Sequence, residues 1–339
     1  MELDSTTLDK INKIKERCQA IKPLVVIRCI TYNHEPYIKD ALEGFVMQKT
    51  DFPIVSIVHD DASTDNTAGI VREYAEKYPD IIFPIFETEN QYSKRDGSLG
   101  EIMKTAQDAT GAKYIAFCEG DDYWTDPLKL QKQVDFLESH PDYGMCYTKT
   151  KFYYQNVQKF DNKEWGGPHT QIENLLLNNY CIPTASIVVR KDIYNQYNED
   201  VKEKKQWLMG DYPLSLYVCG ASKIHFINEC QCVYRVLGES ACHFKNIEDS
   251  LKFESSAFDV KKYYIKLFNL QSLYNQIESE YNVSCIIRCI LYNDYNLTKK
   301  FHFRMVGIKT FLIKLMIINR IMFSISQLIV KWKYKKFVK

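Results

Sequence analysis

Two acidic clusters are the residues of this sequence most able to do chemistry. The first, Glu119-Gly120-Asp121-Asp122, directly follows the apolar run 114–118. An acid-x-acid spacing in extended backbone puts two carboxylates on the same side. Mg²⁺ and Mn²⁺ prefer oxygen ligands, and Mg²⁺ is often held by one or two carboxylates together with phosphates of a bound molecule. The cluster therefore predicts a Mg²⁺ or Mn²⁺ site, although a solvated turn or a helix cap explains the same residues.

The second cluster runs from Asp60 to Asp65, directly after the apolar run 54–58. Ser63 to Asp65 are typical of the cap of a following helix, where acidic residues favour the helix dipole. Capping does not explain Asp60 and Asp61, which come first. We expect an aspartate there to accept hydrogen bonds from a base N–H or a ribose hydroxyl.

Short apolar runs alternate with helical periods through the first 150 residues, which predicts βαβ units and a parallel sheet covered on both faces. The carboxyl ends of such strands share one edge, where ligands bind. Thr31, Tyr32, Asn33 and Glu35 follow the first strand, so we expect them at the same edge as the acids. The predicted strands are 24–30, 54–58, 81–86 and 114–118, and the predicted helices are 37–48, 64–77, 99–109 and 128–138.

Composition and motifs exclude several classes of protein. The formal net charge of +1 argues against a nucleic-acid binder. No Gly-x-Gly-x-x-Gly follows the first strand and no P-loop occurs, so phosphates cannot rely on a glycine-rich cradle. Residues 1–22 contain no apolar signal-peptide core, so we expect a cytoplasmic location in which the 11 cysteines stay reduced and serve as small apolar residues.

The remaining chain is less regular. Strands are predicted at 185–189 and 230–236, a helix at 210–219, and helical structure from 247 to 281. The segment Ile27–Asn33 (IRCITYN) is echoed by Ile287–Asn293 (IRCILYN). No acidic cluster follows the echo, so coincidence explains it better than a second domain. We divide the chain into a helical lead-in (1–22), a main domain (23–245) and a helical region (246–339).

The tail 300–339 belongs to a strongly basic segment: residues 295–339 hold 11 basic and no acidic residues. Its longest uncharged run, 321–330, is shorter than the roughly 20 residues of a spanning helix. A helix lying on an anionic membrane surface fits this composition. Because the basic residues are not confined to one helical face, packing against the domain or an oligomer contact remains an alternative.

The order Ile30-Thr31-Tyr32-Asn33, then 60–67, then 119–124 resembles the family 2 glycosyltransferases of GT-A fold, over roughly residues 23–240. The resemblance implies an α/β fold: a Rossmann-like, mostly parallel sheet flanked by helices, with a nucleotide-binding half (23–125), an acceptor half (126–245) and a basic helical extension. It further implies that Asp121 is the metal-binding acid of an Asp-x-Asp motif whose first acid is Glu119 here, with Asp122 assisting. The implied nucleotide contacts are Thr31, Tyr32, Asn33, Glu35, Asp60, Asp61, Arg95 and Asp121.

The same resemblance implies roles for later residues. Asp211 in Trp207-Leu208-Met209-Gly210-Asp211 corresponds to the catalytic base, although capping the next helix is its simpler role. Arg235 would place positive charge near the diphosphate, with an ordinary surface arginine as the alternative. His243 is a candidate third metal ligand, although a lone histidine after a loop is more often not a ligand. Trp124 and Trp207 are expected beside the diphosphate or the acceptor.

The implied reaction is inverting sugar transfer from a nucleoside diphosphate sugar, most often a UDP-sugar, to a saccharide or lipid-linked saccharide in surface polysaccharide assembly. The enzyme would then work at the cytoplasmic face of a membrane. A nucleotide-binding protein without turnover is the main alternative. A phosphoryl-transfer domain using Asp60 or Asp61 is another, but it leaves the cluster at 119–122 unexplained.

Overall fold

The computed structural model describes residues 3–178, 182–201, 207–238, 244, 246–301, 313, 316–318 and 320–333. The chain divides into two compact units. Unit 1 comprises residues 1–170, 181–205 and 221–236, and unit 2 comprises residues 171–180, 206–220 and 237–339. Segments 171–180 and 206–220, assigned above to the acceptor half, thus group with the helical region.

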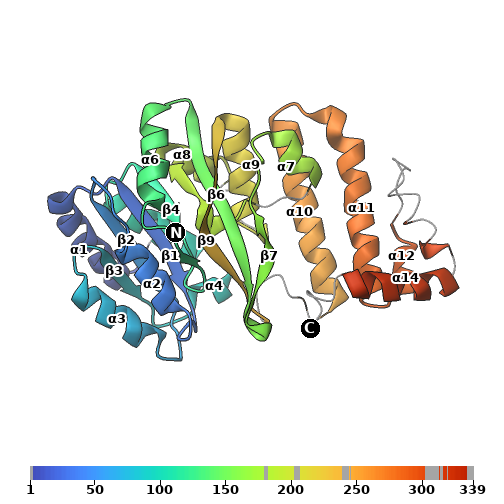
Figure 1. The fold of residues 1–339 in the computed structure, drawn as a ribbon, viewed down its shortest axis with the longest axis horizontal. Coiled ribbons are helices and arrows are strands. Elements are labelled where there is room, and N and C mark those ends of the chain that lie inside the picture. Colours follow the sequence, from blue (N-terminus) through green and yellow to red (C-terminus); the bar gives the residue numbers. More distant parts are fainter. Residues whose placement is uncertain are drawn as a thin grey trace. The chain divides into compact units, whose positions relative to one another are not determined.

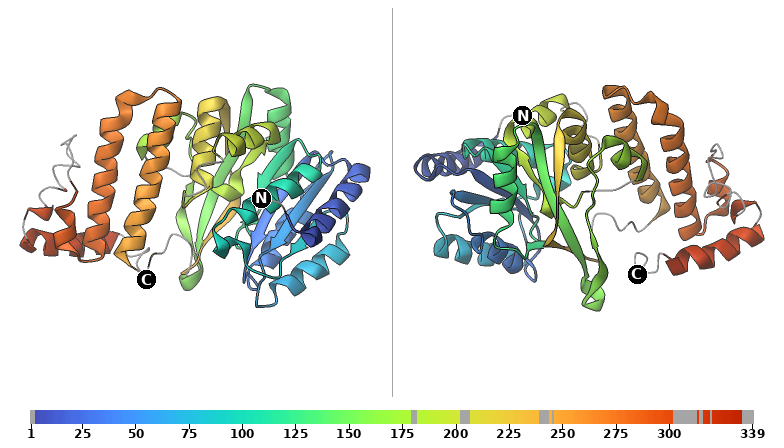
Figure 2. Two further views of the ribbon diagram at one scale, coloured as in Figure 1. Left: turned by 180° about the vertical axis from the view of Figure 1, so that it is seen from behind. Right: turned by 45° about the horizontal axis from the view of Figure 1, so that its top comes forward.

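Four parallel strands form one half of the unit 1 sheet, in the order β3-β2-β1-β4. Their near-continuous apolar residues require cover on both faces. Helices α2 and α3 pack on one face, and α5 with α1 packs on the other (Figures 1 and 2). The predicted βαβ alternation is confirmed. The bounds are β1 (Val25–Thr31), β2 (Ile54–Asp60), β3 (Ile82–Phe86), β4 (Tyr114–Phe117), α1 (Ser5–Ile21), α2 (Ile38–Val46), α3 (Thr67–Lys77), α4 (Gln91–Lys94) and α5 (Ser98–Ala109).

The other half of the sheet makes it mixed. β8 pairs antiparallel with β4 and β6, β9 runs parallel to β6, β5 pairs antiparallel with β9, and β7 folds back onto β6. Strands β5, β6 and β7 were not predicted. Residues 144–148 of β6 are buried one after another, and six of the seven residues of β7 are exposed, so neither strand has the regular alternation that identifies a half-buried strand. The bounds are β5 (Tyr123–Trp124), α6 (Lys129–Ser139), β6 (Tyr143–Tyr154), β7 (Lys159–Trp165), β8 (Val188–Arg190), α8 (Lys191–Asp200) and β9 (Lys223–Val236), with 3-10 turns at Gln155–Val157 and Thr184–Ser186.

Unit 2 is helical in its described residues. Helix α11 contacts α7, α10, α12 and α14, and its Val283, Ile286 and Ile290 pack against Phe323 and Val330 of α14. Within the described residues, no helix combines the length and the apolar character needed to cross a membrane. The bounds are α7 (Ile172–Asn178), α9 (Asp211–Ala221), α10 (Ile247–Leu267), α11 (Tyr274–Leu291), α12 (Tyr295–Thr298) and α14 (Arg320–Lys333), with a 3-10 turn at Gln271–Leu273.

The echoed segments adopt different structures. Ile27–Thr31 lies in strand β1, whereas Ile287–Leu291 lies in helix α11. The similarity therefore marks no structural repeat, as the sequence analysis inferred.

Candidate functional site

The loops after β1 and β2 are joined by side-chain hydrogen bonds at the carboxyl edge of the parallel strands. Asn33 adopts a left-handed conformation (φ 54°), and its Oδ1 accepts from the backbone N–H of Thr64 at 2.7 Å. The Asn33 N–H donates to Ser63 Oγ at 2.9 Å. Glu35 completes the junction, because its carboxylate accepts from the N–H of Asn66 at 3.0 Å. Asn33 and Glu35 thus hold two loops together.

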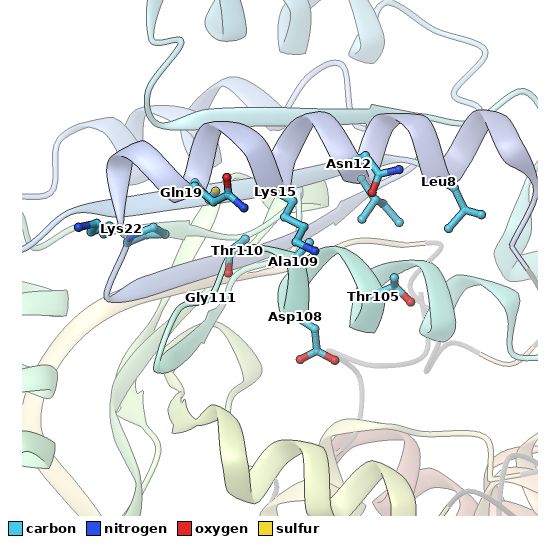
Figure 3. Close-up of a pocket in the computed structure, with 13 residues that line it drawn as sticks. Leu8, Asn12, Lys15, Gln19, Lys22, Thr105, Asp108, Ala109, Thr110 and Gly111 are labelled. Carbon is cyan, nitrogen blue, oxygen red and sulfur yellow. The ribbon is translucent and has the colours of Figure 1, made fainter.

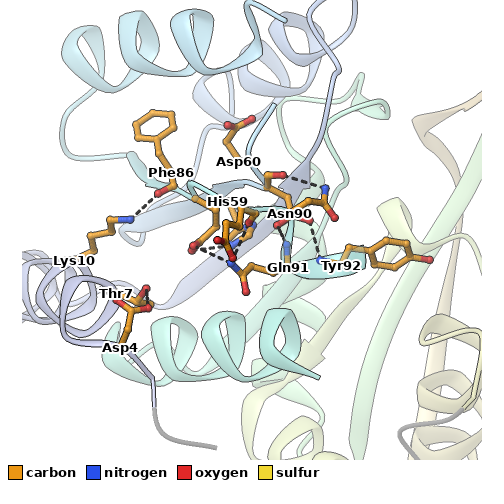
Figure 4. A network of polar contacts seen from close by, with 12 residues as sticks. Asp4, Thr7, Lys10, His59, Asp60, Phe86, Asn90, Gln91 and Tyr92 are labelled. Atoms are coloured by element: carbon orange, nitrogen blue, oxygen red, sulfur yellow. Dashed lines mark hydrogen bonds and ion pairs between the residues drawn. The ribbon is translucent and has the colours of Figure 1, made fainter. Parts of the chain in front are cut away.

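Asp60 and Asp61 are both buried and hold neighbouring backbone. The Asp60 carboxylate accepts from the hydroxyl and the N–H of Ser63. Burial raises the pKa of Asp60, and these hydrogen bonds oppose the rise. The Asp61 carboxylate accepts from the N–H groups of Gln91 (2.7 Å) and Tyr92 (3.0 Å), the two residues at the start of α4 that Figure 4 labels, so it positions that helix.

The predicted N-cap at Ser63 or Thr64 does not fit the start of the helix, but Asp65 does accept from the N–H of Thr67, the first residue of α3, at 3.0 Å. Helix α3 begins at Thr67, three residues later than expected, with Asn66 at its N-cap position. Ser63 instead bonds to Asp60 and Asn33, because these partners lie on the adjacent turn.

Gly120 brings the end of β4 against the end of β1. A Cβ at this position would lie 2.6 Å from Thr31 Oγ1 and 2.9 Å from His34 Nδ1, so only glycine fits without movement. The Gly120 N–H donates to the carbonyl of Ile30 at 2.9 Å. Thr31 is fully buried beneath this contact. The prediction that its side chain contacts a nucleotide at the surface therefore does not fit its position.

Glu119 is held by its own chain. Its carboxylate accepts from Arg28 Nη1 at 3.1 Å and from the N–H of Ile30 at 3.1 Å. Burial raises the pKa of Glu119, and the Arg28 guanidinium opposes that rise. Glu119 is thus held in place by its own chain while 32% of its side chain stays exposed, and its role as a metal ligand stays a prediction.

Asp121 and Asp122 differ in exposure. Asp122 is buried and its Oδ1 accepts from the N–H of Arg235 at 2.8 Å, whereas Asp121 is partly exposed. Burial, and then the adjacent Asp121, raise the pKa of Asp122 well above its usual range. Among the described residues, no three His, Cys, Asp or Glu side chains gather closely enough to hold a metal ion unaided. His243 lies outside the described residues.

Arg235 projects from β9 into a set of tyrosine rings. Its guanidinium lies 4.8 Å from the Tyr123 ring centroid, 5.2 Å from Tyr37 and 5.9 Å from Tyr153. It also donates to Asp40 of α2. Arg235 is therefore a buried cation one backbone hydrogen bond away from Asp122.

Two expected contacts lie elsewhere. Trp124 is 2% exposed, packs against Phe45 and donates its indole N–H to the carbonyl of Ala185 at 2.8 Å, so it is a core residue and cannot contact a surface ligand here. Arg95 is exposed at the end of α4, and Tyr32 is 43% exposed at the carboxyl edge.

The remaining predicted residues belong to unit 2. Asp211 is the first residue of α9, is partly buried, and its Oδ1 accepts from the N–H of Tyr212 at 2.8 Å. This bond runs to the next residue along the chain, so the roles of Asp211 as helix cap and as catalytic base both stay predictions. Trp207 packs against Tyr263 and Tyr264 of α10, with ring centroids 5.4 and 6.1 Å apart.

A pocket of about 720 Å³ lies between α1 and α5 (Figure 3). Its wall includes Pro23, just before β1, and Gly111, just before β4. It runs along the two helices, from Leu8 to Lys22 on the side of α1, and contains none of the predicted site residues.

Sequence reasoning missed Asp40 and the segment 90–92. Asp40 is 195 residues from Arg235, and its helix periodicity alone suggests an ordinary exposed acid. The segment 90–92 gives no chemical signal, because it contributes backbone N–H groups and not a motif.

Part of this chain resembles known families and proteins. The model of the family described as "Glycosyl transferase family 2" matches residues 27–197. An uncharacterised protein of Mycobacterium tuberculosis is 41% identical over 165 residues, 48% of this chain and 45% of that protein. A dTDP-rhamnosyl transferase of Shigella flexneri is 34% identical over 130 residues, 38% of this chain and 43% of that protein. The chain thus spans less than half of each of these relatives.

Two solved structures share the fold. One is TarS residues 1–349 of S. aureus in complex with UDP-GlcNAc (TM-score 0.53, 14% identity, 86% of this chain and 90% of that chain). The other is a mannosyltransferase of Pyrobaculum calidifontis in complex with GDP-Man and Mn²⁺ (TM-score 0.54, 13% identity, 97% and 95%). These likenesses confirm the expected α/β fold. Because the family model covers half of the sequence, including every loop of the carboxyl edge, this chain belongs to glycosyl transferase family 2.

Proposed function

We propose that this protein is an inverting glycosyltransferase that moves a sugar from a nucleoside diphosphate sugar to a hydroxyl of a saccharide or a lipid-linked saccharide. Membership of the family supports the reaction class. The observation that carries the site is the carboxyl edge itself. There hydrogen bonds join the segments that follow β1, β2, β3 and β4, and the partly exposed Asp121 lies in the segment after β4.

The donor nucleotide and the pathway are finer parts of the proposal. The similar proteins name dTDP, UDP-GlcNAc and GDP-Man, so they do not select one base. A UDP-sugar is our first choice. A 34% identical relative from Bacillus subtilis, described as a putative teichuronic acid biosynthesis glycosyltransferase, supports a role in surface polysaccharide assembly.

We place the nucleotide at the carboxyl edge. Tyr32 (43% exposed) and Tyr92 (62% exposed) offer aromatic faces there for a base. Asp61 orients the start of α4, which carries Tyr92, through the N–H groups of residues 91 and 92. In this proposal Asp61 therefore acts on the base indirectly, through the position of Tyr92.

The acids fit a divalent cation shared with the donor. Asp121 would supply its partly exposed carboxylate, and Asp122 would add its second oxygen, since Oδ1 accepts from the Arg235 N–H. Among the described residues no three acidic or histidine side chains gather there, so diphosphate oxygens would fill the remaining positions of the ion. A bound Mg²⁺ or Mn²⁺ would neutralise charge on the departing diphosphate. Arg235 supplies fixed positive charge beside Asp122.

Asp211 is the proposed general base. Its carboxylate takes the proton from the acceptor hydroxyl, and the hydroxyl oxygen forms a bond to the anomeric carbon. The bond from that carbon to the diphosphate oxygen breaks from the opposite face, and the nucleoside diphosphate leaves with the electron pair. The configuration at the anomeric carbon is thereby inverted.

The first test is a screen of nucleotide sugars with Mn²⁺ or Mg²⁺, with released nucleoside diphosphate as the readout. The wild-type protein should release nucleoside diphosphate from one donor class, and that nucleotide should raise the melting temperature only when metal is present. Asp121→Asn should lose both effects, because it removes the partly exposed carboxylate. Nucleotide binding without release from any donor would instead favour the binding protein without turnover.

Matched variants separate the roles of the acids. Asp80→Asn makes the same chemical change at an exposed position between α3 and β3, and it should behave as wild type. Glu119→Gln should keep the metal-dependent shift, since Arg28 and the Ile30 N–H already occupy that carboxylate. Asp211→Asn should keep nucleotide binding and lose transfer; an active Asp211→Asn enzyme would remove the base assignment.

The proposal includes a location. We place the enzyme at the cytoplasmic face of a membrane, held by the basic segment 300–339, where a lipid-linked acceptor is presented.

A further inference from the structure

The described part of α14 has two apolar faces. Phe323 and Val330 are buried against α11, with 3% and 6% of their surface exposed. Ser326, between them, is 1% exposed. We call these residues the inner face. The outer face consists of Ile321 (73% exposed), Met322 (37%), Ile325 (47%), Leu328 (73%) and Ile329 (52%).

Helical geometry explains the separation of these faces. Side chains advance by about 100° per residue, so positions three and four apart share a face. Residues 323, 326 and 330 follow that spacing on one side, and 321, 325 and 328 follow it on the opposite side. This helix can therefore pack on α11 through its inner face and contact a partner through its outer face at the same time.

The charge of the surrounding chain selects the partner. Residues 295–339 contain 11 basic and no acidic residues. A second copy of the chain placed on the outer face would bring two such segments together, and like charges repel. An anionic lipid surface supplies both the apolar phase for isoleucine and leucine and the opposite charge for lysine and arginine.

We infer that the outer face of α14 docks in the interface of an anionic membrane while its inner face stays packed on α11. This deepens the location given in the proposed function and rests on it for its purpose. The helix is too short to span a bilayer, since its 14 residues fall below the roughly 20 required. It therefore lies along the surface, and the packed inner face couples unit 2 to that surface.

The test measures binding of the full chain to vesicles, without donor, acceptor or metal. We compare vesicles of phosphatidylcholine with vesicles that also contain phosphatidylglycerol. The wild-type protein should bind the anionic vesicles more tightly, and added salt should weaken binding because it screens the charges. Ile325→Ser combined with Leu328→Ser should lower the partition coefficient at least about tenfold, given the apolar surface removed from lipid.

Two controls keep the test decisive. Leu128→Ser with Val157→Ser removes two exposed apolar side chains of unit 1 (43% and 64% exposed) and should leave vesicle binding unchanged. The outer-face variant should keep the wild-type melting temperature, since its side chains are not packed.

Equal vesicle binding by wild type and the outer-face variant would overturn the inference. Wild-type protein that binds anionic vesicles no more tightly than phosphatidylcholine vesicles would overturn it as well. If light scattering shows a wild-type dimer that the outer-face variant abolishes, without vesicle binding, the partner is a second copy and the lipid assignment is wrong. A failed donor screen leaves these outcomes unaffected, so the two proposals fail separately.

Discussion

Lys129 is a cation in the core of unit 1. It is 0% exposed, its Nζ donates to Gln133 Oε1 at 2.7 Å, and it lies 4.4 Å from the Trp124 ring centroid. Burial lowers the pKa of Lys129 to about 8. Because the lysine pKa of an unfolded chain is higher, at about 10.4, the unfolded state holds this proton more tightly than the folded state.

The first prediction at this scale is a pH dependence. Between about pH 8 and pH 10.5 the unfolded chain binds more protons at Lys129 than the folded protein, so the contribution of this residue to stability rises with pH. The Lys129→Met variant has no ionisable group at this position. The free energy of unfolding of wild type relative to Lys129→Met should therefore rise by roughly 2–3 kcal/mol across that window.

Urea titrations of both proteins at each pH measure this difference, and tyrosine and cysteine ionisations common to both cancel. A constant difference across the window would mean that Lys129 keeps an ordinary pKa.

The predicted acids divide into two kinds at the residue scale. Asp60, Asp61 and Glu119 accept hydrogen bonds from their own chain, whereas Asp121 stays partly exposed. The sequence predicted where these acids gather. It could not predict this division, because each of the three partners depends on how a loop folds back.

At the element scale, the approach of β4 to β1 depends on Gly120. The space between the strand ends holds Thr31 and His34, and it leaves no room for a Cβ. Since Asp121 and Asp122 follow immediately, a shift of this turn moves both carboxylates.

We predict that Gly120→Ala lowers the free energy of unfolding by about 1–3 kcal/mol and weakens metal-dependent nucleotide binding, because an overpacked contact forces the backbone to move. Gly100→Ala is the matched control. A Cβ at Gly100, in α5, meets nothing within 4 Å. That variant should be neutral or more stable by about 0.5–1 kcal/mol. Wild-type binding by Gly120→Ala would show that the turn does not position the acids.

The echoed segments show how far an element is set by its context. The same Ile-Arg-Cys-Ile pattern forms strand β1 between two parallel neighbours and a turn of α11 among helices. In β1, Arg28 pairs with Glu119 of the acidic cluster; in α11, Arg288 pairs with Glu254 of α10. Local propensity is a weak term that packing overrides.

At the scale of the whole molecule, the basic C-terminal segment contributes to the core of unit 2. Phe323 packs against Tyr295 with ring centroids 5.3 Å apart, and it joins the apolar cluster of α11. Deleting residues 300–339 would uncover that cluster, so a truncation would confuse loss of membrane binding with loss of packing.

We therefore predict opposite outcomes for two neighbouring substitutions in α14. Phe323→Ala should lower the free energy of unfolding by about 3 kcal/mol or more, because it leaves a cavity on α11. Ile325→Ala, on the outer face, should change it by less than about 0.5 kcal/mol. Chemical denaturation of both variants measures this, and similar losses would mean that both faces of α14 are packed.

The alternation of strands and helices in the first half was predictable from the residues alone, and so was the edge at which the acids meet. That alternation depends on local hydrophobic periodicity. Parallel pairing alone then places the carboxyl ends of the strands at one edge of the sheet. Family membership was also readable, because its motifs lie within short segments.

The contacts that each predicted site residue makes became visible only in the folded structure. It placed Trp124 in the core, paired Arg235 with Asp40 across 195 residues, and turned α14 so that one apolar face is packed and the other exposed. Such pairings depend on which surfaces come into contact when distant elements pack. The pattern of apolar and charged residues along the chain does not show which distant residues those are.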